Sequence, residues 1–237
     1  MLTLLTFAGD SHDPSFSPFC VKAMCLLQMS GLDWQRKDVA MPRNTPHGRL
    51  PVLLDGDQVI ADSSFIQAHL EARGVEFNAG LSAAQKAQSH ALIRMVEENL
   101  RCGLVTDRWL NAENWLWVKQ AFFGKLPGPL KGIVPNIVRR KVRRAMEAQG
   151  IAQFDEPDRL ARLGADLEAL TVVLGDQPFL FGDAPTAADA AILPVLSMID
   201  GLPNDTGLRR LMRANAALVA YVDRARPVLY PPAEGQV

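Results

Sequence analysis

The sequence predicts an α+β protein in two parts: a small mixed β-sheet with packed helices over residues 1–78, and an all-helical region over 82–237. Strand and helix signals alternate through the first part, and strand signals stop after Gly80. The 237 residues are 48% hydrophobic and 22% charged, which is typical of a folded chain with a buried core. Together these observations argue against a disordered chain and against a purely helical or purely β protein.

The first part is expected to follow the order strand, helix, strand, and then strand, strand, helix. Asp55-Gly56-Asp57 predicts a hairpin turn between the last two strands. Ser17-Pro18 and Asp62-Ser63 are typical helix starts, because serine and aspartate cap free backbone N–H groups. Strands are expected at residues 2–7, 34–39, 50–54 and 58–61, and helices at 17–31 and 62–73.

The second part has apolar residues at helical spacing throughout. A stretch rich in glycine and proline, from Gly124 to Pro135, is expected to interrupt the helices. Thr186 and Asp189 have the spacing of a capping box, so Asp189 is assigned a structural role and not a catalytic one. Helices are expected at residues 82–112, 137–148, 156–175, 186–200 and 206–225.

Charge and cysteine content narrow the class of protein. A net charge of -1 provides no general attraction to nucleic acid, so no nucleic-acid partner is expected. Three cysteines do not suggest a disulfide framework, and the apolar start lacks the basic residues of a secretory signal. We therefore expect a cytoplasmic protein. The four histidines lack metal-ligand spacing, so no metal is expected.

Ser17 is the first candidate site residue. Its structural role would be to cap the helix that begins at Pro18. In a functional role, its hydroxyl would lie at the positive end of the helix, where free N–H groups stabilise a bound thiolate. The sequence leaves both roles open.

Leu50-Pro51 and Asp62-Ser63 are the other two candidates. Proline at the start of a strand either marks an edge or leaves the preceding residue free to pair with an extended ligand. Asp62 and Ser63 either cap a helix or bind the ammonium and carboxylate of an amino acid. Each pattern is weak alone, and their order along the strands makes the stronger signal.

In that order, the three patterns resemble the glutathione S-transferase family, whose N-terminal domain is thioredoxin-like. Ser17-Pro18-Phe19 is similar to the Ser-Pro-Phe of serine-type plant transferases. Residues 50–53 and 61–64 match two further family positions, with Asp62 where glutamate is commoner. Residues 58–66, 132–150 and 178–189 are similar to the failed-axon-connections and metaxin-like branch, so the resemblance covers most of the chain.

The resemblance implies a homodimer that binds glutathione as co-substrate and conjugates it to an apolar electrophile. It assigns Ser17 to thiolate activation, Leu50 and Pro51 to the cysteinyl part, and Asp62 and Ser63 to the γ-glutamyl end. Phe19 belongs to the same binding motif. Residues 38–48 are short for the second helix of many transferases, and Lys37, His47 and Arg49 are candidates for the glycyl carboxylate. The alternative is a non-catalytic interaction module with the same fold.

Three further features of the sequence can each be interpreted in two ways: Cys20, a group of aromatic residues, and a basic helix. Cys20 is expected to be a core residue, with a minor alternative as a nucleophile. Trp109, Trp115 and Phe122, with their neighbours Trp117 and Phe123, are either core or the lining of an apolar substrate site above Ser17. From residue 114 to 146 every charged residue is basic, so the helix at 137–148 has either a solvated face or a surface for a membrane or an acidic protein.

Overall fold

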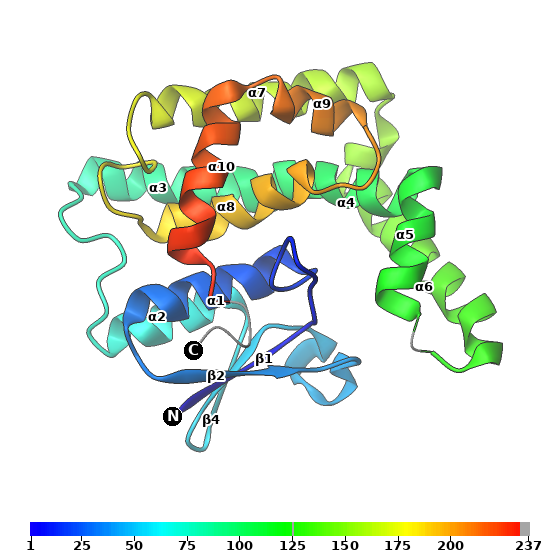
Figure 1. Ribbon diagram of the computed structural model, residues 1–237, viewed down its shortest axis with the longest axis horizontal. Helices are drawn as coiled ribbons and strands as arrows, with labels where there is room; N and C mark the ends of the chain where they lie inside the picture. The colour runs from blue at the N-terminus through cyan, green and yellow to red at the C-terminus, as the bar shows by residue number, and fades with distance from the viewer. Residues whose placement is uncertain (125, 233–237) are drawn as a thin grey trace.

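The computed structural model describes residues 1–124 and 126–232 of the chain. It has a four-stranded sheet with two helices on one side, next to a larger layer of helices (Figure 1). The sheet contains β1 (Leu2–Thr6), β2 (Trp34–Asp38), β3 (Val52–Asp55) and β4 (Gln58–Ala61). The two helices beside it are α1 (Pro18–Ser30) and α2 (Ser63–Ala72).

The strands lie in the order β2-β1-β3-β4, with β1 parallel to β2 and antiparallel to β3. The hairpin predicted at Asp55-Gly56-Asp57 joins β3 and β4, and all four strands begin and end within two residues of their expected bounds. In β1, Leu2 and Leu4 are buried among the core residues, as expected for the apolar start of the chain. This is the α+β, thioredoxin-like domain that the sequence predicts.

The remaining elements are helical, which agrees with the loss of strand signals after Gly80. The stretch expected at 82–112 is α3 (Ala83–Met95), the π-helical turn η3 (Val96–Leu100) and α4 (Arg101–Leu110). The other helices are α5 (Ala112–Phe123), α6 (Gly128–Gln149), α7 (Glu156–Leu174), α8 (Ala187–Asp200), α9 (Gly207–Arg213) and α10 (Ala216–Leu229). Short 3-10 turns lie at Pro42–Asn44, Pro46–Gly48 and Ile151–Gln153.

One expectation for this region is confirmed in part and another is wrong. The break expected from Gly124 to Pro135 is shorter, because α5 ends at Phe123 and α6 begins at Gly128 and contains Pro135. Proline in a helix costs one backbone hydrogen bond, and the long helix outweighs that loss. The helix expected at 206–225 is two helices, because Asn215 caps a new start with its side chain and accepts from the Leu218 N–H.

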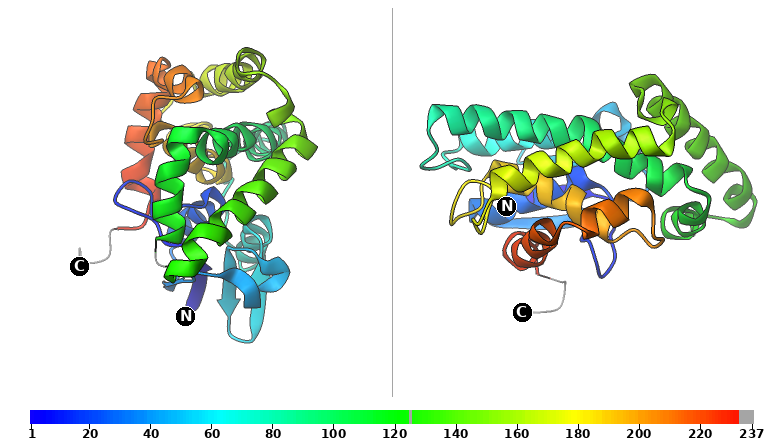
Figure 2. Two further views of the ribbon diagram at one scale, coloured as in Figure 1. Left: turned by 90° about the vertical axis from the view of Figure 1, so that its right-hand side faces the viewer. Right: turned by 90° about the horizontal axis from the view of Figure 1, so that it is seen from above.

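The sheet domain meets the helical layer through α1, which packs against α8 (Figures 1 and 2). Every described residue of α8 before Asp200 is buried, so α8 is the central helix of the molecule. Asp189 in its first turn accepts hydrogen bonds from the Thr186 N–H at 2.7 Å and the Tyr221 hydroxyl at 2.9 Å. The capping box is therefore present, and Asp189 has the structural role predicted for it.

A buried ion pair also links the two layers. Lys22 of α1 and Glu97 of η3 are each only 2% exposed, and their Nζ and Oε1 atoms are 2.7 Å apart. The second oxygen of Glu97 accepts from Arg94 at 2.9 Å. Because an unpaired charge is costly to bury, this contact requires both partners.

The loop between β1 and α1 is anchored to the helical layer by Asp13. Its Oδ1 accepts from the Ser197 hydroxyl of α8 at 2.8 Å and from the Tyr230 hydroxyl at 2.9 Å. Asp10 tightens the same loop by accepting from the backbone N–H groups of His12 and Asp13. The loop that leads to Ser17 is thus held by contacts that are far away in the sequence.

At the β3–β4 turn, Asp55 contacts two basic side chains, His69 of α2 and Arg73 directly after α2. Its Oδ2 accepts from His69 at 2.9 Å and from Arg73 at 2.8 Å. These contacts hold the pKa of Asp55 below its usual value, and the hydrogen bond from His69 has the largest effect. An unfolded aspartate has a pKa of about 3.9, so the contact should stabilise the fold above about pH 4 and lose that effect as the pH falls through the lower folded pKa.

We expect Asp55→Asn to lower the free energy of unfolding by up to about 1 kcal/mol at pH 6, because the pair is partly exposed. The difference from wild type should be smaller at pH 2.5, because the carboxyl gains a proton as the pH falls. Urea titrations at both pH values, with Asp57→Asn in the same turn as the control, measure this. An equal loss at both pH values would contradict the ionic explanation.

Among the described residues, none of the helices is both long enough and apolar enough to span a membrane.

Candidate active site

Ser17 lies at the N-terminal end of α1 and caps it. Its Oγ accepts from the Cys20 N–H at 3.4 Å, and its own N–H donates to the Ser15 hydroxyl at 3.3 Å. The backbone of Ser17 is extended, with φ −107° and ψ 120°, and α1 begins at Pro18. Ser17 is half-buried. Because the hydroxyl is the acceptor in this capping bond, it keeps its own proton to donate to a ligand at the positive end of the helix.

Arg108 of α4 places a cation beside this helix end. Its guanidinium donates to the Phe16 carbonyl at 2.8 Å, one residue before Ser17. Burial lowers the pKa of Arg108 to about 10, so it is still positively charged at neutral pH. Among the described residues its Nε has no hydrogen-bond partner. Only the packing of α4 against the loop brings Arg108 here, and no local motif marks it.

We call the three predicted site positions loci, and Ser17 is the first of them. The second locus, Leu50-Pro51, is the segment before β3. The peptide bond between Leu50 and Pro51 is cis, and the Leu50 side chain is buried against Cys20 and Val52. Among the described residues, no hydrogen bond engages the N–H or the C=O of Leu50. Both backbone groups are therefore available to an extended peptide ligand.

The third locus is the start of α2. Asp62 has a φ of +81°, which is rare for a residue other than glycine, and its Oδ1 accepts from the Ser64 N–H at 2.8 Å. Ser63 is 1% exposed, and among the described residues its Oγ has no hydrogen-bond partner. A buried hydroxyl without a partner is costly, and at a helix N-terminus it matches the needs of a carboxylate.

The three predicted loci meet in space. The Asp62 N–H donates to the Pro51 carbonyl at 3.2 Å, which joins the second locus to the third. Cys20 in the first turn of α1 belongs to the same small buried cluster as Leu50 and Val52, which joins the first locus to the second. Ser17, Leu50-Pro51 and Asp62-Ser63 thus surround one region where the strands end and α1 and α2 begin.

Cys20 and Phe19 occupy the first turn of α1. Cys20 is fully buried, and burial raises the pKa of its thiol despite nearby hydroxyls of Thr6, Ser17 and Ser15. The expectation of a core role is confirmed, because a neutral buried thiol is a poor nucleophile. The Phe19 ring is half-buried beneath the Arg101 guanidinium, 5.3 Å from its centroid.

The predicted aromatic residues form one cluster that reaches Ser17 at one end. The ring centroids of Trp109 lie 6.1 Å from Trp115 and 5.2 Å from Phe122. Phe122 lies 4.9 Å from Phe16, the residue before Ser17. Trp115 is buried under the Arg139 guanidinium, whereas Trp109 and Phe122 are half-buried. Trp109 and Phe122 are thus partly accessible, and Trp115 supports them from inside.

The segment after β2 is as short as expected. Two 3-10 turns replace the second helix that many transferases have, and Lys37, His47 and Arg49 are exposed. His47 has a φ of +59°. These three residues stay candidates for a ligand carboxylate. Among the described residues, no group of three or more His, Cys, Asp or Glu side chains is placed to hold a metal ion.

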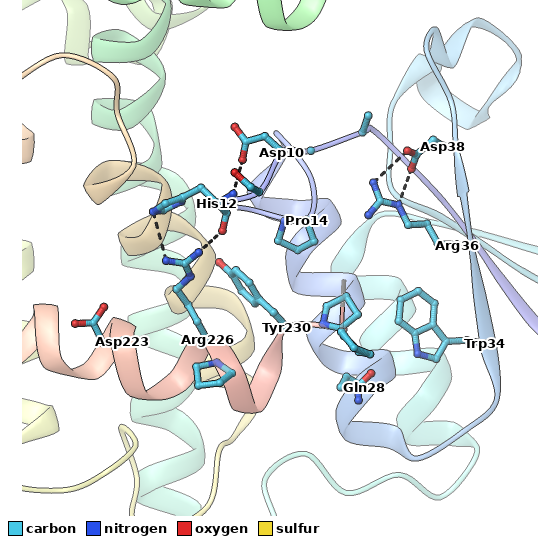
Figure 3. Close-up of a pocket in the computed structure, with 16 residues that line it drawn as sticks. Asp10, His12, Pro14, Gln28, Trp34, Arg36, Asp38, Asp223, Arg226 and Tyr230 are labelled. Carbon is cyan, nitrogen blue, oxygen red and sulfur yellow. Dashed lines mark hydrogen bonds and ion pairs between the residues drawn. The ribbon is translucent and has the colours of Figure 1, made fainter. Parts of the chain in front are cut away.

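A cavity lies at the outer edge of β2, lined by other residues than these loci (Figure 3). It measures ≈ 890 Å³ and lies between β2, the loop before α1, and the end of α10. Among the residues that line it, Arg36 forms an ion pair with Asp38, and Arg226 lies within hydrogen-bond distance of the His12 ring. None of the predicted site residues lines it.

Comparisons with known proteins agree with this geometry. The Glutathione S-transferase N-terminal domain family matches residues 18–114, and the Glutathione S-transferase, C-terminal domain family matches residues 163–225. Among solved structures, a glutathione transferase of Phanerochaete chrysosporium superposes with a TM-score of 0.67, covering 98% of both chains at 15% identity, which shows a shared fold.

Among the curated relatives, one is named as a transferase and others are not. The isoprene-epoxide–glutathione S-transferase of Rhodococcus sp. (strain AD45) is 28% identical over 95% of this chain and 98% of its own length. Failed axon connections of Drosophila melanogaster is 28% identical over 98% of this chain and 58% of its own length. Metaxin-1 of Sus scrofa is 25% identical over 97% of this chain and 75% of its own length. This chain therefore belongs to the glutathione S-transferase superfamily and is related to its metaxin-like branch.

Proposed function

We propose that this protein binds glutathione and conjugates it to an apolar electrophile. The observation that carries the proposal is the Ser63 hydroxyl, which is buried at the start of α2 with no partner among the described residues. The unusual Asp62 backbone and the unengaged backbone of Leu50 lie next to it. An unused set of donors and acceptors of this kind fits a peptide ligand with an amino-acid end.

In the proposed complex the γ-glutamyl carboxylate accepts from Ser63 and from the α2 N-terminus, and its ammonium faces Asp62. The cysteinyl backbone pairs with Leu50, which brings the sulfur to Ser17. The Ser17 hydroxyl donates to the thiolate, and the α1 N-terminus and Arg108 add positive charge. No part of this arrangement requires a metal.

The thiolate then attacks an electrophilic carbon, and the electron pair of the broken bond passes to the leaving group. With an epoxide it passes to the ring oxygen, which then takes a proton. The name of the Rhodococcus relative supports epoxides as one electrophile class. Trp109 and Phe122 are the partly accessible rings that we propose contact the apolar part of the substrate, with Trp115 behind them.

Thermal unfolding with and without millimolar glutathione tests the first step. A ligand at about a hundred times its dissociation constant adds about 2.7 kcal/mol of stability. The relatives named metaxin-1 and Failed axon connections favour a second candidate, an interaction module that does not bind glutathione. An unchanged midpoint would support that second candidate.

We expect Ser63→Ala to weaken glutathione binding about tenfold to a hundredfold, because a hydrogen bond to a charged group contributes about 1.5–3 kcal/mol. The free energy of unfolding should stay the same or rise, since the hydroxyl has no partner to lose. Calorimetric titration and urea unfolding measure the two effects, with exposed Ser64→Ala as the matched control. Lower stability with unchanged affinity would contradict the assignment.

We also propose that the protein is a homodimer. Phe65 of α2 is 69% exposed and Val59 of β4 is 56% exposed. Large apolar side chains exposed on neighbouring elements support a contact between two copies.

A further inference from the structure

The outer face of α6 carries one continuous line of exposed side chains. Leu130, Ile133 and Ile137 are 44%, 59% and 43% exposed. The same face continues with three exposed basic residues, Arg140, Lys141 and Arg144. Spacings of three and four residues place all six on one side of a helix. We call these six residues the α6 stripe.

The opposite face of α6 holds the helix to the protein. Val142 and Met146 pack against the core, and Arg139 donates to the carbonyls of Trp109 and Leu110, both at 2.9 Å. Ile137 does not share this inward face, because it is 43% exposed. The stripe is not needed for the folding contacts of α6.

The aliphatic and basic residues of the α6 stripe occupy different halves of the helix. Its aliphatic residues lie in the N-terminal half of α6, which forms one end of the molecule with α5 (Figures 1 and 2). Its basic residues lie in the C-terminal half, nearer the body. From Asn114 to Met146 every charged residue is basic, although the whole chain has a net charge of -1.

We propose that the α6 stripe docks on an anionic lipid surface. A membrane has an apolar layer beneath a charged layer, which matches aliphatic side chains at the projecting end followed by arginine and lysine. The concentration of positive charge in a nearly neutral chain complements anionic headgroups. A nucleic acid would satisfy the basic residues but leave Leu130, Ile133 and Ile137 in water. This inference does not depend on the proposed transferase activity.

Flotation of the full chain with vesicles tests the proposal. Wild type should float with phosphatidylcholine vesicles that contain phosphatidylserine, float poorly with phosphatidylcholine alone, and be released by salt. The triple variant Arg140→Gln, Lys141→Gln, Arg144→Gln should bind about a hundredfold more weakly, because each basic side chain near the surface contributes about a fivefold effect. The double variant Ile133→Ser, Ile137→Ser should lose about tenfold.

Matched variants elsewhere on the surface separate the stripe from total charge and hydrophobicity. Lys37→Gln, Lys86→Gln, Arg210→Gln makes the same change in net charge, and Val172→Ser, Val228→Ser removes two other exposed aliphatic side chains. Both controls should bind like wild type. The proposal is overturned if wild type does not float with anionic vesicles, if the controls lose as much as the stripe variants, or if a soluble polyanion binds while vesicles do not. Circular dichroism confirms that each variant is folded.

Discussion

Replacement of Ser17 by alanine is expected to lower kcat/KM for glutathione conjugation about a hundredfold at neutral pH, the typical effect of removing one donor to a developing or bound anion. The affinity for glutathione should change little, because Ser63, Asp62 and Leu50 hold the rest of the peptide. The reason is the ionisation of the bound thiol, which the Ser17 hydroxyl and the α1 N-terminus favour. Initial rates with an aryl halide or an epoxide measure this.

The activity deficit of Ser17→Ala is also expected to depend on pH in a definite direction. Losing a donor to the thiolate raises the pKa of the bound thiol, so the variant has less thiolate than wild type at low and neutral pH. At a pH above both thiol pKa values, ionisation no longer limits the variant. The deficit should therefore shrink as the pH rises, and a deficit that is constant with pH would contradict the proposed role.

Ser17 also caps α1, so capping must be separated from catalysis. Ser17→Ala should cost about 1 kcal/mol of stability through the lost cap. Ser17→Asp keeps a good cap but places a negative charge beside the thiolate, so it should be as stable as wild type and at least as inactive as the alanine variant. Ser17→Thr keeps both functions and should retain activity. If activity followed stability across the three variants, Ser17 would be structural only.

Glu97→Gln is expected to cost about 3–5 kcal/mol of unfolding free energy, which is the typical cost of leaving one partner of a buried pair without its counter-charge. The Lys22 ammonium would then face a neutral amide in a place where it is 2% exposed. Because Lys22 belongs to α1 and Glu97 to η3, the variant loses stability at the junction between the sheet domain and the helical layer. Urea unfolding followed by circular dichroism measures it.

Two further variants isolate the charge pairing. Lys22→Met should cost less than Glu97→Gln, since Arg94 still contacts the other oxygen of Glu97 at 2.9 Å. The double variant Lys22→Met, Glu97→Leu should recover much of the stability, because an apolar pair removes both desolvated charges. Arg94→Gln is the control and should cost up to about 1 kcal/mol, since Arg94 is 45% exposed. Costs for the Lys22 and Glu97 variants no larger than this control would contradict the prediction.

Local patterns in the sequence were sufficient for the elements of the fold and for much of the candidate site. Alternating apolar residues, the turn at Asp55-Gly56-Asp57 and the capping residues Ser17, Asp62 and Thr186 act within a few neighbouring positions, so each can be interpreted without the rest of the chain. The break expected at 124–135 is shorter in the structure for the same reason, since glycine and proline weaken a helix locally while the packing of Val142 and Met146 holds α6.

What the sequence by itself determined was therefore the order of strands and helices, the family resemblance, and the identity of the residues at the three loci. Only the tertiary structure decided that the Ser63 hydroxyl lacks a partner, that Arg108 lies beside the Phe16 carbonyl, and that Lys22 meets Glu97. It also decided that Ile137 faces outward while Arg139 turns inward. Burial and charge pairing depend on side chains that meet from distant positions, and no local pattern encodes such a meeting.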